Sequence, residues 1–367
     1  MKVLLVGDYS GVHYNLWVAL KALNIDVTLI SDGDGSKEIP TQLSWRNSEK
    51  NSKFKKYIDS HGINFLSLNR DIIESCRGFD IVQIVNPVIC ESLSSKLNLD
   101  FFSYLKINNK KVFMYSVGDD LRWVSYHLFS NKTKSMFNDK RVLISRESFH
   151  PLRYVLYPGY RKLCKRVYSD VNAIIPGSLD YYLSNKGFDN VTKIVPFPLD
   201  IGALPYRRKD SYDSFTLFHG IQKGKRLRKG YKVFEEIKKI VSDNKKIKVI
   251  NVESVPYSKY VNLLADSDIV FDQSVSYDQG MNAVIAMAMG KIVFSGFEKE
   301  FYEYYDLNHE CGINANSNLD DMLNEMLNIT NDHARFEKMA ISARNFVLDK
   351  HDHIKVAKEF IEIWNCY

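Results

Sequence analysis

The 367-residue sequence contains no apolar run that approaches the roughly 20 residues needed to cross a bilayer. Its first apolar stretch, Val3 to Val6, is too short for the core of a signal peptide, so we expect a cytoplasmic protein. Five cysteines are scattered along the chain without a CxxC pair, which disfavours structural zinc and thiol exchange. The sequence also lacks a repeat with a period of about 20 to 50 residues, which excludes solenoids and propellers.

The composition is that of a globular protein, because 45% of the residues are hydrophobic and 26% are charged. Its length suits two domains of roughly 150 to 200 residues each. The net charge of +6 favours anionic partners, without choosing among nucleic acid, lipid headgroups and phosphorylated metabolites.

Short apolar strands alternate with helical stretches along the chain, which predicts parallel, doubly wound sheets. The first series starts with a strand at Lys2 to Val6, a glycine turn and a helix at about Tyr14 to Leu23. Further strands are predicted at Val27 to Ile30, Asp80 to Val85, Lys111 to Tyr115, Val142 to Ile144 and Ala173 to Ile175. The proline-bearing stretch Val195 to Leu199 suits a hinge. We therefore predict domains at residues 1–195 and 200–345, with a C-terminal helix at 346–367 that packs back on the first domain.

The second series contains a polar loop that follows a predicted strand and ends at a glycine. Asp272 follows the strand, and Gly280-Met281-Asn282-Ala283 opens a helix of small residues. The unpaired N–H groups of a helix start bind phosphate, so we predict a phosphate site there. The alternative is a loop and a small-residue helix that simply pack on the sheet.

A basic loop, His219 to Gly230, follows another predicted strand. From Lys223 to Lys248, 11 Lys and Arg residues stand against three acids, and most of these cations indicate a solvated helix face. Lys229 and one of Arg226 or Arg228 differ, because they lie in a glycine-flanked loop where a fixed cation can meet a diphosphate.

Together these segments resemble the donor half of the family 4 retaining glycosyltransferases. Lys229-Gly230 matches the family's first block, and Ala286-Met287-Ala288-Met289-Gly290 matches the end of its second. The resemblance implies an α/β protein of the GT-B fold, with two Rossmann-like, doubly wound domains facing a cleft. The first domain is expected to bind the acceptor and the second the nucleotide-sugar.

The resemblance further implies sugar transfer to an acceptor hydroxyl with retention, without a metal or a cofactor. We expect the product to be a surface polysaccharide or a glycolipid. Lys229, Arg226 or Arg228, Gly220 and the helix start at Gly280 would stabilise the diphosphate. On the acceptor side, the resemblance points to Gly11, His13, Asp119 and Asp120.

One departure from the family concerns the donor ribose. The family's second glutamate falls on Ile285, which cannot accept a hydrogen bond, and its first falls near Tyr277 or Asp278. Either Glu253, Asp272 or Asp278 takes over the ribose, or donor binding has shifted or been lost. The alternative function is therefore a nucleotide-sugar-binding protein without turnover.

Other readings of the sequence carry less weight. No nucleic-acid recognition module is visible, so a nucleic-acid partner is not expected. Asp32-Gly33-Asp34 formally matches a manganese motif, but Asp-Gly after a strand predicts a turn. His351-Asp352-His353 lacks further metal ligands and is expected on the surface.

A basic-aromatic segment, Leu152 to Val167, predicts contact with an anionic membrane surface. Its cations are Arg153, Arg161, Lys162, Lys165 and Arg166, with no acid among them. The alternative is a helix whose apolar side packs on the sheet while its cations face water.

Overall fold

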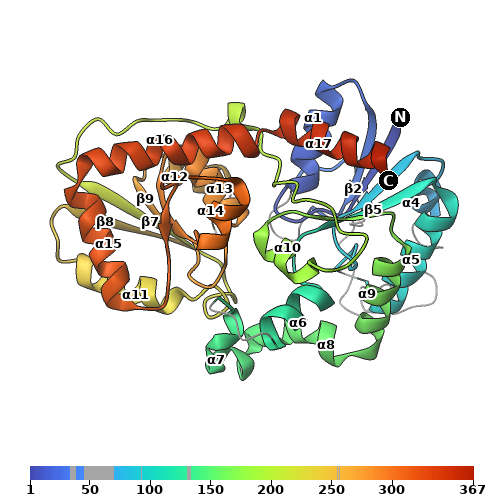
Figure 1. The fold of residues 1–367 in the computed structure, drawn as a ribbon, viewed down its shortest axis with the longest axis horizontal. Helices are drawn as coiled ribbons and strands as arrows, with labels where there is room; N and C mark the ends of the chain where they lie inside the picture. Colours follow the sequence, from blue (N-terminus) through green and yellow to red (C-terminus); the bar gives the residue numbers. More distant parts are fainter. Residues whose placement is uncertain (34–38, 45–69, 92, 130–133, 254, 256) are drawn as a thin grey trace. The chain divides into compact units, whose positions relative to one another are not determined.

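The computed structural model describes residues 1–33, 39–44, 70–91, 93–129, 134–253, 255 and 257–367. The chain forms two compact units (Figure 1). Unit 1 comprises residues 1–126, 151–199 and 353–367, and unit 2 comprises residues 127–150 and 200–352.

The sheet of unit 1 is parallel in every pairing of its described strands, in the order β3-β2-β1-β4-β5-β6. The strands are β1 (Lys2–Val6), β2 (Asp26–Ser31), β3 (Leu43–Ser44), β4 (Ile81–Ile84), β5 (Lys111–Ser116) and β6 (Ile174–Pro176). The chain reverses direction across the sheet between β1 and β4, which is the position where open α/β sheets bind ligands.

Helices cover this sheet, and two of them come from opposite ends of the chain. The helices of unit 1 are α1 (Val12–Ala22), α4 (Arg70–Ser75), α5 (Ser95–Asn108), α9 (Pro158–Asp170), α10 (Leu179–Asn185) and α17 (His353–Cys366). Helix α6 (Leu121–Phe129) leads out of the unit and α8 (Phe149–Leu156) leads back into it. Helix α17 packs against α1 (Figure 1), so the last described helix completes the layer that the first one starts.

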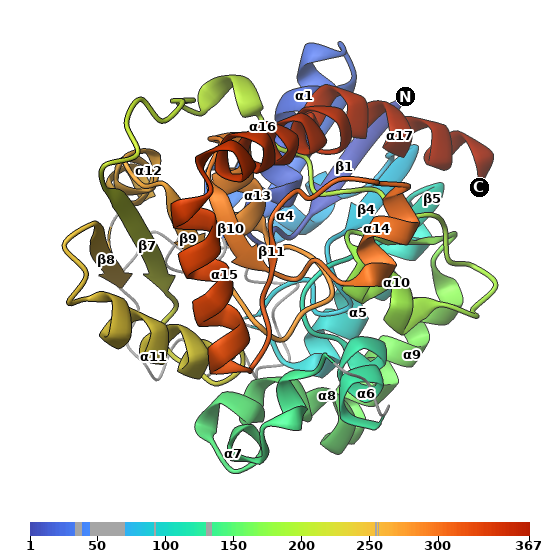
Figure 2. The same ribbon diagram turned by 60° about the vertical axis from the view of Figure 1, so that its left-hand side comes forward.

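The sheet of unit 2 is also parallel in every described pairing, in the order β11-β10-β9-β7-β8 (Figure 2). Its strands are β7 (Phe215–Ile221), β8 (Ile247–Glu253), β9 (Ile269–Phe271), β10 (Ile292–Ser295) and β11 (Ile313–Asn314). Strands β9 and β10 are buried throughout, as the continuous apolar runs in the sequence predict.

The helices of unit 2 enclose an aromatic core. Outside residues 127–150, they are α11 (Tyr231–Val241), α12 (Tyr257–Ala265), α13 (Met281–Ala288), α14 (Lys299–Tyr305), α15 (Leu319–Asn331) and α16 (His333–Lys350). One core cluster joins side chains of α11, α15 and α16 to the strands, with Phe234 stacked on Phe271 at 4.5 Å between ring centroids. Helix α13 packs against α16.

The segment His127–His150 differs from the sequence prediction in two respects. It belongs to unit 2, although we placed it in the first domain. The strand predicted at Val142 to Ile144 is wrong, because α7 (Lys140–Leu143) lies there. The Asp139 side chain accepts a hydrogen bond from Arg141 N at 3.0 Å, and this N-cap starts a helix where three apolar residues alone suggested a strand.

The two units also exchange chain segments after Leu199 and after Asp352. Residues 353–367 belong to unit 1, and the change of unit falls between Leu199 and Asp200, at the end of the predicted hinge. Among the described helices, none is long and apolar enough to span a membrane.

Candidate functional site

A buried ion pair lies at the carboxyl edge of the unit 2 sheet. Lys229 comes from the loop after β7 and Asp272 directly follows β9, and Lys229 Nζ lies 2.8 Å from Asp272 Oδ1. Burial alone would lower the pKa of the Lys229 ammonium, but the charge of Asp272 raises it above its ordinary value. Lys229 is therefore a permanent, fixed cation.

The start of α13 lies beside this pair. A Cβ added to Gly280, the N-cap residue, would lie 3.6 Å from Asp272 Oδ2. Ser295 Oγ donates to the same oxygen at 3.1 Å. Lys229, Asp272, Gly280 and Ser295 thus come together from three strand ends, and they combine a cation with a helix N-terminus in the way that phosphate sites do.

The loop that carries Lys229 is fixed to the loop after β9. Ser274 N donates to Lys229 O and Ser274 Oγ donates to Gly230 O, both at 3.0 Å. Gly230 has φ of 67°, and a Cβ there would lie 2.1 Å from Ser274 Oγ, so this position requires glycine.

Glu147 holds the backbone just before Lys229. Its carboxylate accepts hydrogen bonds from three consecutive N–H groups, Arg226 at 3.1 Å, Leu227 at 2.9 Å and Arg228 at 3.0 Å. One carboxylate therefore fixes the turn that delivers Lys229. Sequence analysis missed Glu147, because the loop it binds lies about 80 residues further along the chain.

Lys134 anchors the same segment at its other end. Its buried ammonium lies 3.0 Å from Glu298 Oε1 and also donates to Ser274 O and Ala315 O. The segment His127–His150, which we call the bracket, is thus attached to both loops of the candidate phosphate site. No pattern in the sequence pointed to Lys134.

The two arginines predicted to meet a diphosphate already have partners. Arg226 Nη2 lies 3.1 Å from Glu253 Oε2 at the end of β8. Arg228 Nε lies 3.3 Å from Met136 Sδ in the bracket. Both arginines belong to the loop that carries Lys229, but their side chains bind Glu253 and Met136 rather than the Lys229–Asp272 pair.

The three acids considered for the ribose differ in exposure. The side chain of Glu253 is 38% exposed, whereas Asp272 and Asp278 are almost completely buried. Ile285 is 5% exposed in the interior of α13, so it is a core residue. Ala283 is fully buried, Met281 nearly so and Asn282 half-buried, which leaves mainly backbone groups at the start of α13.

Gly220 and His219 serve the packing at the end of β7. A Cβ on Gly220 would lie 2.9 Å from the Tyr260 ring. His219 is fully buried among the edges of Tyr231, Phe234 and Phe271. Burial, aided by the charge of Lys238, lowers the pKa of His219 to about 2, so this ring is neutral.

In unit 1, His13 has a structural role. Its Nδ1 donates to Gly7 O at 2.7 Å, so Nε2 accepts from Gln83 Nε2 at 3.2 Å. Burial lowers the pKa of His13 to about 4. Both ring nitrogens are engaged inside the core, which argues against a contact of this ring with the acceptor.

Asp120, which the resemblance assigned to the acceptor side, lies directly before α6 in the loop that follows β5. Its Oδ1 accepts a hydrogen bond from Trp123 N at 2.8 Å, and burial raises the pKa of the carboxyl to about 6. The neighbouring Asp119 accepts a hydrogen bond from Asn86 Nδ2 through its backbone oxygen. Gly11, with φ of 81°, is the N-cap of α1.

A second polar cluster of unit 1 was not predicted. Tyr9 Oη donates to Glu91 Oε1 at 3.1 Å, and Arg153 Nη2 lies 2.8 Å from Glu91 Oε2 and donates to Tyr154 Oη. Arg153, which the sequence analysis assigned to a membrane surface, is therefore part of this cluster at the carboxyl edge of the sheet.

Of the two metal motifs considered from the sequence, His351-Asp352-His353 was expected on the surface, but His351 is buried, with 5% of its surface exposed. Asp34 lies outside the described residues. Within the described ranges, no group of three or more His, Cys, Asp or Glu side chains could hold a metal ion.

Comparison with known proteins rests on structure, since no family model and no curated protein sequence matches the chain. HepE from Anabaena, solved with UDP and glucose, superposes with a TM-score of 0.60 at 13% identity over the full length of both chains. Sucrose-phosphate synthase from Thermosynechococcus elongatus gives 0.61 at 12% identity, covering 100% of this chain and 98% of that one. A glycosyltransferase from Rickettsia africae gives 0.53 at 15% identity, covering 99% and 97%. The fold is therefore GT-B, with two Rossmann-like units.

Proposed function

We propose that the protein transfers a glycosyl group from a nucleotide-sugar to an acceptor hydroxyl. The observation that carries this proposal is the Lys229–Asp272 pair beside the start of α13, at the carboxyl edge of the unit 2 sheet in a GT-B fold. Because HepE was solved with UDP and with UDP-glucose, we propose a uridine diphosphate sugar as the donor.

In this reaction the bond between the sugar and the diphosphate breaks, and negative charge develops on the leaving phosphate. We propose that Lys229 and the N–H groups at the start of α13 stabilise that charge and that no metal takes part. We propose that the sugar keeps its anomeric configuration and that the leaving phosphate oxygen takes the proton of the acceptor. His13, which is buried and neutral, is then not needed as a base.

The ribose of the donor is assigned to Glu253. Of the three acids considered, it alone is substantially exposed at a strand end. Its partner Arg226 is also exposed, so the two side chains can separate to admit a ribose hydroxyl at little cost.

The test is a thermal-shift screen of nucleotides and nucleotide-sugars, followed by product analysis. A ligand at 100 times its dissociation constant adds about 2.7 kcal/mol to stability. We expect stabilisation by UDP and by a UDP-sugar, together with slow donor hydrolysis. Absence of stabilisation by every nucleotide would contradict the proposal.

A second candidate function is donor binding without turnover. It is favoured by Ile285, which replaces a carboxylate, and by the engagement of Lys229 with Asp272. Stabilisation by UDP-sugars without hydrolysis or product, with any acceptor tested, would favour this second function.

We further propose a lipid-linked or polysaccharide acceptor at an anionic membrane surface. In unit 1, Leu156 and Tyr157 are 66% and 62% exposed, and the adjoining helix α9 exposes cations on one side. The exposed cations are Arg161, Lys162, Lys165 and Arg166. Binding to anionic but not to neutral vesicles, weakened by salt, is the expected result. Equal recovery in the supernatant at low salt would leave a water-soluble acceptor.

A further inference from the structure

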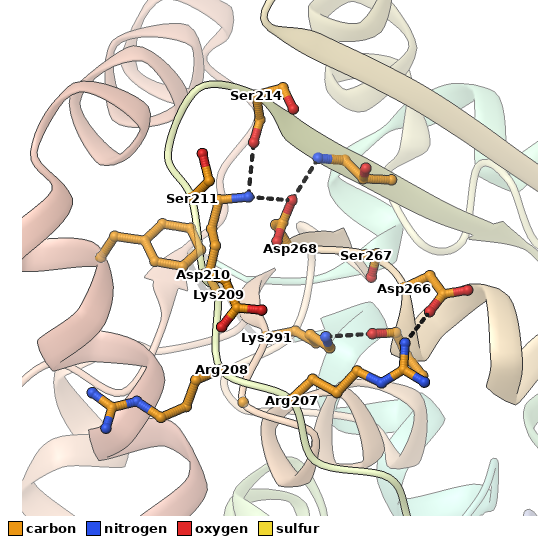
Figure 3. Close-up of a pocket in the computed structure, with 14 residues that line it drawn as sticks. Arg207, Arg208, Lys209, Asp210, Ser211, Ser214, Asp266, Ser267, Asp268 and Lys291 are labelled. Atoms are coloured by element: carbon orange, nitrogen blue, oxygen red, sulfur yellow. Dashed lines mark hydrogen bonds and ion pairs between the residues drawn. The ribbon is translucent and has the colours of Figure 1, made fainter.

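A cavity of about 280 Å³ lies at the opposite edge of the unit 2 sheet from the candidate site (Figure 3). It is bounded by the segment before β7, by the turns before β9 and β10, and by Phe336 of α16. The amino ends of the strands meet here, so this cavity is distinct from the site that holds Lys229.

Cations from two elements converge on one turn of this cavity. Lys291 Nζ donates to Ala265 O at 2.6 Å, and Arg207 Nη1 lies 2.9 Å from an oxygen of Asp266 (Figure 3). Lys209 Nζ lies 3.0 Å from Asp268 Oδ2, which also accepts from Thr216 N. Three cations therefore share two carboxylates at the turn Ala265–Asp268.

The two carboxylates of this turn form ion pairs with cations other than Lys291. Arg208 is paired outward with Glu337 of α16, and three further cations and three carboxylates line the cavity. The charged lining residues are Arg207, Arg208, Lys209, Asp210, Asp266, Asp268 and Lys291. Lys291 is only 5% exposed, and its ammonium donates a hydrogen bond to a neutral carbonyl oxygen.

Burial lowers the pKa of the Lys291 ammonium to about 8, despite the attraction of Asp268 and Asp266. A buried ammonium that keeps its proton with difficulty, beside a cavity large enough for a small molecule, is stabilised when an anion enters.

We propose that this cavity binds the phosphate or carboxylate group of a small metabolite through Lys291 and Arg207. Such a ligand brings a negative charge to the buried Lys291 ammonium, which otherwise donates to a neutral carbonyl oxygen. Both side chains have N–H groups beyond those used in the contacts described above, so they can bind the anion while keeping those contacts. The site does not depend on the proposed glycosyl transfer.

The test is calorimetric titration of the full chain with inorganic phosphate and, separately, with acetate, at constant ionic strength. Because phosphate can also bind near Lys229, the titration compares Lys291→Met with Lys229→Met, two buried lysines at opposite edges of one sheet. We expect binding at the cavity to survive in Lys229→Met and to weaken at least tenfold in Lys291→Met. Arg207→Gln should also weaken anion binding at the cavity. Because Arg207 is exposed, this variant tests the site even if Lys291→Met does not fold.

The pH dependence supplies an independent readout. Affinity should fall as the pH rises above about 8, where Lys291 loses its proton. Binding of phosphate but not acetate would identify a phosphate site, and the reverse a carboxylate site. If Lys291→Met and Arg207→Gln bind both anions as wild type does, or if wild type binds neither, the proposal is wrong.

Discussion

Lys229 and Asp272 form a buried pair, so replacement of one residue affects the other. Lys229→Ala should cut turnover about 100- to 1000-fold through loss of leaving-group stabilisation. It should also cost about 3–5 kcal/mol of stability, because Asp272 stays buried without its cation. Steady-state kinetics and urea denaturation measure the two effects.

The double variant Lys229→Met with Asp272→Asn separates these effects. It removes both charges and should recover most of the stability while turnover stays low. Recovery of turnover together with stability would show that Lys229 acts only through folding.

The His13 ring predicts a pH-dependent stability of unit 1. The folded state favours the neutral ring, so its contribution is present above pH 6.5 and is lost as the pH falls toward 4. The loss amounts to about 3 kcal/mol. As the pH is lowered over this range, the unfolding temperature of wild type should therefore fall more steeply than that of His13→Gln. If the unfolding temperatures of both proteins depend equally on pH, folding does not change the pKa of the His13 ring.

At the scale of elements, the bracket predicts a role for Glu147. In Glu147→Ala, three backbone N–H groups of the Lys229 loop lose their shared acceptor, which costs about 1–3 kcal/mol. Hydrogen exchange of residues 226–228 should speed up, and UDP affinity should fall about tenfold because the loop no longer holds Lys229 in place.

Two further variants sharpen this test. Glu147→Gln keeps one acceptor oxygen and should lie between wild type and Glu147→Ala. Glu303→Ala, on α14, removes an acid that is 60% exposed and paired with Lys299, and it should change neither exchange nor affinity. Unchanged exchange in Glu147→Ala would show that the carboxylate does not hold the loop.

The sequence predicted the elements whose signals are local. Alternation of apolar strands with helices located β1, β4 and β5, and Gly230 and Gly280 marked the loop and helix start of the candidate site. It could not predict Glu147 or Lys134, because their partners are set by packing rather than by spacing. It misassigned Val142 because the cap at Asp139 outweighs a short apolar run.

At the scale of the whole molecule, α17 is part of the first unit's core. Trp364 is fully buried, its Nε1 donates to Gln83 Oε1 at 3.1 Å, and Lys111 Nζ donates to its backbone oxygen. Trp364→Ala should therefore destabilise unit 1 by about 3–5 kcal/mol. Hydrogen exchange should rise in β1 and β4 but not in β7 and β9.

The control is Tyr367→Ala, since Tyr367 is 46% exposed at the same end of the chain. It should leave exchange in both sheets unchanged. A Trp364 variant whose exchange rises equally in both sheets would mean that the two units unfold together.

The interleaving of the two units has a consequence for the order of folding during synthesis. The bracket leaves the ribosome well before the strands it binds, so Lys134 and Glu147 must wait for residues 226–315. Unit 1 in turn lacks α17 until unit 2 has been made. Neither unit can reach its final packing domain by domain from the N-terminus, and a chain stalled near residue 200 would expose the apolar surface of unit 1 that α17 covers.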